Sequence, residues 1–286
     1  MVHNKFTGSE NYKERMFTRI MKKICVFLFA LLLFMTGCSV DSDTDLSAPE
    51  ASDDITASPY AEPKQTGWVE DGEKYYYLLE DGSLATGKHV IDGKTYCFDS
   101  QGLLIILVNP WNYKPENYKP NLLSIGRGQY IHEMCYDDLM QMLSDCNAAG
   151  HTYRIDYAYR SYQLQTMLFL KAVSQYVLRG YSREKAGKIV GKSTAVPGTS
   201  EHELGLAIDI VDKDKPGRNS AQANTDTQKW LMANSWKYGF ILRYPNGKTN
   251  ITGIIFEPWH YRYVGKEIAK EIYESGMCLE EYLEAM

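Results

Sequence analysis

Alternating apolar and small positions mark the stretch from residue 199 to 211, which reads T-S-E-H-E-L-G-L-A-I-D-I-V. Apolar residues occupy every second position of its second half, and Gly205, Ala207 and Asp209 lie between them. Because side chains alternate between the two faces of a strand, this spacing predicts a strand with one apolar face. The other face carries very small side chains around one carboxylate, which leaves room for a metal ion and a substrate.

Similar patterns predict further elements in the rest of the chain. Apolar residues at helical spacing predict helices over residues 136–149, 162–178, 227–238 and 266–275, and short apolar runs predict strands over 153–159, 240–244 and 253–256. Helices and mostly antiparallel strands in this order predict an α+β domain over residues 104–286. A domain of this length can build a single sizeable core.

A repeat with a period of about twenty residues occupies residues 66–103. Thr66-Gly67 recurs as Thr86-Gly87, and Tyr76 recurs as Tyr96. Aromatic-rich segments separated by Asp-Gly turns are typical of short hairpins, and such hairpins stabilise one another by stacking. We therefore expect a small module of β-hairpins before the α+β domain.

The N-terminal segment has the layout of a targeting signal. Basic residues precede the apolar run Ile24–Met35, which is short for a membrane span and ends in T-G-C at Cys38. Residues 1–38 are therefore expected to be a bacterial lipoprotein signal, with Cys38 as the lipidated residue of an extracytoplasmic, membrane-anchored protein. An uncleaved anchor helix is the alternative, and translation beginning at Met16 or Met21 would suit a signal better.

Composition and charge further restrict the organisation of the chain and the partners it can bind. Residues 39–65 are acidic and poor in large apolar side chains, so we expect a flexible tether there. The formal net charge is −5 and the chain has no block of basic residues, which argues against nucleic acid as a partner.

Four cysteines follow the expected signal, and none has the C-x-x-C spacing of a metal site. Cys135 and Cys146 fall at opposite ends of one predicted helix, so they are too far apart to pair with each other. Any disulfide must therefore use Cys97 or Cys278.

A second cluster with metal-binding potential, F-E-P-W-H-Y, occupies residues 256–261. With His202 and Asp209 it offers His260 as a third ligand and leaves Glu257 as a nearby carboxylate. Two imidazoles and one carboxylate with an open fourth position are typical of a catalytic zinc site, since structural sites are closed by four ligands. A His-Asp pair by itself is more often hydrogen-bonded at a surface, so the inference depends on the second cluster.

Three motifs together resemble the VanY-type zinc D-Ala-D-Ala carboxypeptidases. They are Y-R-S at residues 159–161, S-x-H-x-x-G-x-A-x-D at residues 200–209 and E-P-W-H at residues 257–260. The resemblance extends from about Leu104 to the C-terminus. It implies a Hedgehog/D,D-peptidase-like zinc domain with a mostly antiparallel sheet and flanking helices.

The same resemblance suggests roles for the residues around the metal. Glu257 would act as the general base on a water molecule activated by zinc. Arg160 would contact the substrate or the transition state, with Gln163 and Ser200 as hydrogen-bonding residues. Alternatives are a surface salt bridge for Arg160, a helix cap for Gln163 and a turn position for Ser200.

The expected activity is removal of the terminal D-Ala from peptidoglycan stem peptides. An L,D-carboxypeptidase acting on the shorter tetrapeptide stem is an alternative, and a wall-peptide binding module without catalysis is another. Residues 66–103 look like choline- or glucan-binding cell-wall repeats, although Lys88 stands where a partner for Trp68 would be expected. A plain hairpin spacer remains open for that module.

Overall fold

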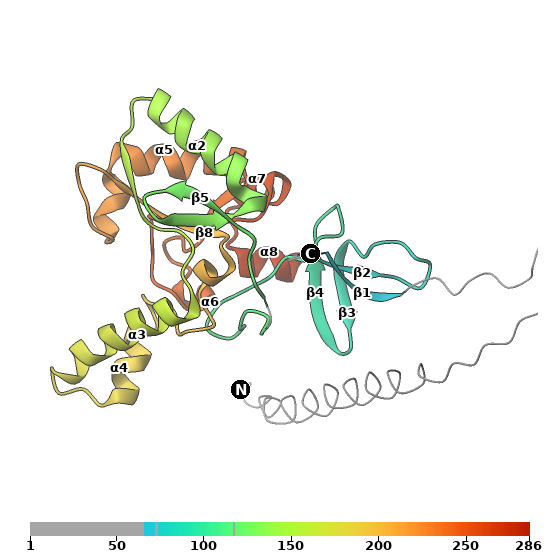
Figure 1. Ribbon diagram of the computed structural model, residues 1–286, viewed down its shortest axis with the longest axis horizontal. Coiled ribbons are helices and arrows are strands. Elements are labelled where there is room, and N and C mark those ends of the chain that lie inside the picture. Colours follow the sequence, from blue (N-terminus) through green and yellow to red (C-terminus); the bar gives the residue numbers. More distant parts are fainter. Residues whose placement is uncertain (1–65, 72–73, 117) are drawn as a thin grey trace, which may run out of the picture. The chain divides into compact units, whose positions relative to one another are not determined.

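The computed structural model describes residues 66–71, 74–116 and 118–286, all within one compact unit (Figure 1). The expected signal at residues 1–38 and the expected tether at residues 39–65 lie outside the described residues. Among the helices described, none combines the length and the apolar character that a membrane span needs.

The expected hairpin module is present as two antiparallel hairpins. The first pairs β1 (Gly67–Asp71) with β2 (Lys74–Leu78), and the second pairs β3 (Gly87–Ile91) with β4 (Lys94–Phe98). The second hairpin turns at Asp92 and Gly93, whose φ angles are 51° and 73°. A two-residue turn with positive φ at both positions matches the twist of the strands, which explains the Asp-Gly signal.

Aromatic side chains join the two hairpins. Trp68 of β1 lies 5.3 Å from the ring of Tyr77 and 4.8 Å from the ring of Tyr96 in the second hairpin. Phe98 is fully buried beneath them together with Ala85. Neither hairpin could bury this surface alone, so each stabilises the other.

A four-stranded sheet forms the centre of the α+β domain. Its strands, in spatial order, are β7 (Tyr153–Tyr157), β8 (Ala207–Asp212), β10 (His260–Tyr263) and β9 (Phe240–Leu242). All neighbouring strands are antiparallel. A separate hairpin joins β5 (Leu122–Gly126) to β6 (Gln129–His132). The expected antiparallel α+β architecture is therefore confirmed.

Helices flank this sheet. They are α2 (Tyr136–Ala148), α3 (Tyr162–Val177), α4 (Arg183–Val190), α5 (Asp226–Asn234), α6 (Thr249–Thr252), α7 (Lys266–Ser275) and α8 (Leu279–Ala285). In Figure 1, α2 and α5 lie together beside the sheet, whereas α3 and α4 form a helical hairpin that extends away from it. The four long helices predicted from apolar spacing are confirmed, although the one predicted over 227–238 divides into α5 and a short 3₁₀ helix, Ser235–Tyr238.

The apolar face predicted around β8 forms the centre of the main core. Leu204, Leu206, Ile208 and Ile210 are all buried, together with Leu139 of α2. Burial of each such side chain contributes about 1.5–3 kcal/mol relative to exposure. This packing also fixes the position of the opposite face of β8, which carries Asp209.

The expected strand over residues 199–211 is wrong in its first half. Residues Glu201–Leu204 form a 3₁₀ helix, and the strand begins only at Ala207. Gly205 between them has a φ of 71°, and a Cβ there would come within 3.0 Å of Leu122. The chain reverses at this glycine, so His202 approaches Asp209 from a helical turn and not along a strand.

Two other expectations are also corrected. Residues 253–256 do not form a strand; they follow α6 as an irregular segment that leads to Glu257. The four cysteines in the described part of the chain are buried free thiols, so the possible disulfide through Cys97 or Cys278 is not formed.

Candidate metal centre

The three expected metal ligands come together in the structure. Asp209 on β8 and His260 on β10 are direct cross-strand partners, and His202 lies on the 3₁₀ helix before β8. One possible ligand atom from each of the three residues lies within 4.8 Å of the others, and all three residues are buried. The sheet register therefore assembles a cluster of two imidazoles and one carboxylate.

Short polar contacts identify the atoms that face the centre of this cluster. Asp209 Oδ1 lies 3.2 Å from His202 Nε2 and 3.0 Å from His260 Nδ1. His202 Nδ1 lies 2.6 Å from the carbonyl oxygen of Ala158, an acceptor, so this nitrogen carries the proton. His202 Nε2 is buried without a hydrogen bond in the described structure. An imidazole lone pair directed at a second imidazole and a carboxylate fits zinc well.

The segment before α3 holds His202 in place from both sides. The Ala158 carbonyl accepts from the ring, and the backbone N–H of Arg160 donates to the His202 carbonyl at 3.1 Å. Burial and the nearby Arg160 lower the pKa of His202 to about 4, so the ring is neutral. The Y-R-S motif thus supports a candidate metal ligand in addition to supplying Arg160.

Glu201 orients the second imidazole and was missed in the sequence analysis. Its Oε2 lies 3.3 Å from His260 Nε2, and its Oε1 accepts from Arg243 Nε at 2.7 Å and Arg262 Nη1 at 2.9 Å. Burial opposes ionisation, but the two guanidinium groups hold the pKa of Glu201 below its usual range. A carboxylate behind a metal-binding histidine sets the orientation of the ring and raises its basicity.

A signal for this network was present in the sequence. Arg243 and Arg262 interrupt the otherwise apolar and aromatic segments F-I-L-R-Y and H-Y-R-Y. Both arginines are fully or almost fully buried, and a buried arginine needs a carboxylate partner. Glu201 and Glu280 supply those partners, with Arg243 donating to both.

The other oxygen of Asp209 is also bound. Arg218 Nη1 donates to Asp209 Oδ2 at 3.1 Å, and Arg218 also approaches Asp156 and the face of Tyr157. Asp209 therefore presents Oδ1 to the two imidazoles while Oδ2 is held from the opposite side. Arg218 lies in an irregular segment, and no periodic pattern could have indicated this contact.

Glu257 lies beside the cluster without joining it. Its Oε2 is 3.9 Å from His260 Nδ1, and the backbone N–H of His260 donates to the Glu257 carbonyl at 3.1 Å. The intervening Pro258 and Trp259 form the turn that the sequence suggested. Burial raises the pKa of Glu257 to about 8 despite the opposing effect of His260. A carboxyl group in this environment can exchange a proton near neutral pH.

Arg160 and Ser200 are brought together, whereas Gln163 is not. Arg160 Nη2 lies 3.5 Å from Ser200 Oγ, and Arg160 Nε is buried without a hydrogen bond within the described residues. Gln163 is exposed on the first turn of α3. The buried amide of that turn belongs to Gln165, whose Nε2 donates to the Ala195 carbonyl at 2.6 Å. Ser161, and not Gln163, caps α3.

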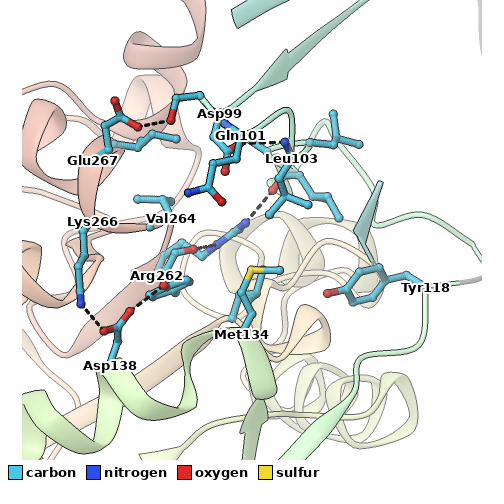
Figure 2. Close-up of a pocket in the computed structure, with 18 residues that line it drawn as sticks. Asp99, Gln101, Leu103, Tyr118, Met134, Asp138, Arg262, Val264, Lys266 and Glu267 are labelled. Atoms are coloured by element: carbon cyan, nitrogen blue, oxygen red, sulfur yellow. Dashed lines mark hydrogen bonds and ion pairs between the residues drawn. The ribbon is translucent and has the colours of Figure 1, made fainter. Parts of the chain in front are cut away.

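A cavity of about 410 Å³ lies where the segment after β4 passes β10 and the start of α7 (Figure 2). None of the three candidate ligands lines it. Arg262 extends from this cavity to the metal centre, because it donates to the Ile106 carbonyl as well as to Glu201. Lys266 and Asp138 on the cavity wall pair with each other at 2.7 Å. This region therefore supports the metal centre through Arg262.

Comparison with known proteins agrees with the geometry. The family model described as D-alanyl-D-alanine carboxypeptidase (VanY) matches residues 128–266, and one described as putative cell wall binding repeat matches residues 66–84. The chain is 40% identical over 205 residues to a D-alanyl-D-alanine carboxypeptidase of Enterococcus faecalis, covering 71% of this chain and 72% of the relative. The chain belongs to the VanY family of D-alanyl-D-alanine carboxypeptidases.

Solved structures of related enzymes agree with this family assignment. The fold is similar to that of a mutant of the vancomycin resistance D,D-pentapeptidase VanY in complex with Zn(II), with 39% identity and a TM-score of 0.57 over 62% of this chain and 97% of that one. It is also similar to the LD-carboxypeptidase LdcB, with 34% identity and a TM-score of 0.55 over 70% of this chain and 94% of that one.

Proposed function

We propose that this protein is a zinc-dependent D,D-carboxypeptidase that removes the C-terminal D-Ala from peptidoglycan stem peptides. The observation that carries the proposal is the buried cluster of His202, Asp209 and His260 with Glu257 beside it. A zinc-bound VanY relative supports the choice of metal, and the E. faecalis relative supports the reaction.

His202 Nε2, His260 Nδ1 and Asp209 Oδ1 would hold the metal. Zinc, when bound, supplies Lewis-acid activation of water and of the scissile carbonyl group. Glu257 would accept the proton of the attacking water and then deliver it to the departing amine of D-Ala. Because Glu257 lies outside the ligand set, its carboxyl group is free to change protonation state during the reaction.

Arg160 supplies the fixed positive charge that a carboxypeptidase needs. Its guanidinium group is buried beside Ser200 and in contact with the face of Tyr157, at 5.1 Å from the ring centroid. A buried guanidinium group with an unused N–H can bind the terminal carboxylate of the substrate or the oxyanion of the transition state. Ser200 would complete this contact, and a role for Gln163 stays a prediction.

The similarity to LdcB is the observation that supports the alternative, an L,D-carboxypeptidase. Both activities require the same metal ligands and the same base, so the residues described so far do not separate them. Mass spectrometry of defined penta- and tetrapeptide stems after incubation with the protein distinguishes the two. Loss of D-Ala from the pentapeptide alone is the expected result, and loss only from the tetrapeptide would contradict the D,D assignment.

Anchoring and wall binding complete the proposal. Lipidation at Cys38 would place the enzyme outside the cytoplasm on the cell membrane, which suits an extracytoplasmic substrate. Residues 66–103 would contact cell-wall choline or glycan, a proposal supported by the family match at residues 66–84. Trp68 is 39% exposed and offers one aromatic surface to such a ligand. Retention on isolated cell walls is compared between the chain and a variant that lacks residues 66–103. Equal retention would indicate that these residues are a plain spacer.

A further inference from the structure

The hairpin of α3 and α4 carries an exposed apolar stripe on the face of α3 that points away from α4. Its members, with their exposed fractions, are Met167 (59%), Leu170 (44%), Val177 (41%) and Leu178 (80%). Leu170, Val177 and Leu178, the last at the C-terminal cap of α3, follow Met167 by three, ten and eleven residues and therefore share one side of the helix. The opposite side of α3 packs against α4 through Val173, Ala186 and Val190. The apolar stripe therefore takes no part in packing α3 against α4.

The same hairpin has a charge opposite to that of the whole chain. Between Tyr162 and Val190 there are five basic residues and one acidic residue, although the chain has a formal net charge of −5. The basic residues are Lys171, Arg179, Arg183, Lys185 and Lys188. All five are exposed. A positive, partly apolar projection on an acidic protein indicates a partner that is both negative and apolar.

We propose that the α3–α4 hairpin docks on the surface of an anionic lipid bilayer. Its tip suits the boundary between headgroups and acyl chains, because Leu178 is flanked there by Arg179 and by Tyr181, which is 37% exposed. Arg179 lies over the ring of Tyr176 and Lys185 over that of Tyr181, at 5.4 and 5.1 Å. These contacts keep the charged groups beside the apolar tip.

Two other possible partners would match the surface of the α3–α4 hairpin less well. A soluble polyanion would use the basic residues but would leave Leu178 and Met167 in water. A second copy of the chain would place one positive hairpin against another, with repulsion between like charges. The bilayer surface satisfies both the charge and the apolar stripe, and this contact is independent of the proposed lipid at Cys38.

The experiment is vesicle sedimentation with a chain of residues 66–286, which lacks the N-terminal signal. The described core lies entirely within these residues, and the solved VanY relative consists almost wholly of the shared domain, so the fragment keeps its fold. We expect binding to vesicles of equal parts phosphatidylglycerol and phosphatidylcholine, and little binding to phosphatidylcholine alone. Arg179→Gln with Arg183→Gln should weaken binding roughly 20- to 30-fold, and Leu178→Ser should weaken it about tenfold.

Matched controls alter similar side chains elsewhere. Lys229→Gln with Lys270→Gln removes two basic groups that are 61% and 56% exposed, and Val90→Ser removes an apolar side chain that is 72% exposed. Equal melting temperatures verify the fold of every variant. The proposal is overturned if both vesicle types bind equally, or if the controls weaken binding as much as the tip variants.

Two further results would also overturn it. Binding that depends on Arg179 and Arg183 but is unaffected by Leu178→Ser would show a purely electrostatic contact and overturn docking through the apolar tip. A concentration-dependent dimer that Leu178→Ser dissociates, without vesicle binding, would assign the stripe to a second copy of the chain.

Discussion

Asp209 and His260 face each other across the β8–β10 ladder, with Oδ1 of the carboxylate 3.0 Å from Nδ1 of the imidazole. Two residues that are 51 positions apart in the sequence are thus joined by the register of one strand pair. His202 approaches the same carboxylate oxygen, at 3.2 Å, from a helical turn. Because the core holds β8 and the turn in position, it fixes the relative geometry of the three candidate ligands.

Replacement of His202 should remove the metal. His202→Ala deletes one of three ligands, and we expect the purified variant to contain no zinc and to show no carboxypeptidase activity. Metal analysis by mass spectrometry, together with turnover of a D-Ala-D-Ala stem peptide, measures both. His151→Ala is the matched control, because His151 lies outside the cluster and should retain both properties. Stoichiometric zinc in His202→Ala would disprove the ligand assignment.

Glu201→Gln tests the support behind His260. The change keeps the shape of the side chain but removes the charge that pairs with Arg243 and Arg262. Zinc affinity should fall about 10- to 100-fold, as for other residues that orient metal ligands. Stability should fall by about 3–5 kcal/mol, because two buried guanidinium groups lose a shared partner. Competitive zinc titration and denaturant unfolding measure the two effects.

The control for Glu201 is Glu281→Gln. Glu281 pairs with Lys248 near the surface, where both side chains are about 30% exposed, so its loss should cost less than about 1 kcal/mol. Zinc affinity in that variant should match the wild type. Equal zinc affinity in Glu201→Gln and the wild type would show that the orientation of His260 does not depend on Glu201.

Arg218 should affect the metal without affecting the fold. Its side chain is 36% exposed and donates to Asp209 Oδ2, so Arg218→Gln should weaken zinc binding while the melting temperature stays the same. Arg154→Gln is a close control, because Arg154 also pairs with Asp156 but makes no contact with Asp209. If both variants bind zinc equally well, Arg218 does not position Asp209.

The sequence predicted the ligand set but not its surroundings, for physical reasons. Two spaced motifs, at residues 200–209 and 257–260, were sufficient to predict the cluster of His202, Asp209 and His260 that the structure brings together. The supporting groups are set by tertiary contacts: Glu201, on the 3₁₀ helix that ends at Gly205, contacts His260, which is 59 positions away in the sequence. Alternation alone favoured a continuous strand through that glycine, and its left-handed conformation overrides the pattern.

Helices were predicted more accurately than irregular segments for a related reason. The spacing of apolar residues along α2 and α7 records which face is buried, so the pattern carries the structure. The segment before Glu257 has apolar residues but no partner strand. Its backbone makes hydrogen bonds to loops instead, as when the N–H of Ile255 donates to the Lys192 carbonyl. Such pairings between distant loops leave no periodic signal.

Membrane attachment is predicted to depend on Cys38. The apolar segment before it is short for a span and ends in T-G-C, so processing should yield a lipidated cysteine. A Cys38→Ala protein expressed in a bacterial host should lose incorporation of a labelled fatty acid and leave the membrane fraction. Cys97→Ala is the control and should keep the label. Unchanged labelling of Cys38→Ala would place the anchor elsewhere.

Glu257→Gln separates catalysis from binding. The change preserves the size of a buried side chain that is not a metal ligand, so zinc content should equal that of the wild type. Without a carboxyl group to transfer the proton, turnover should fall by about 10²- to 10⁴-fold. Affinity for a D-Ala-D-Ala stem peptide should stay within a few-fold, because ground-state contacts through Arg160 are intact.

Turnover, peptide affinity and zinc content are measured together in wild type, Glu257→Gln and the control Glu274→Gln, whose side chain is 60% exposed. Equal turnover in Glu257→Gln and the control would rule out Glu257 as the base. A wild-type protein that binds both stem lengths but cleaves neither would favour a peptide-binding module over an enzyme. Loss of zinc from Glu257→Gln would instead place Glu257 among the ligands, against its position outside the three-residue cluster.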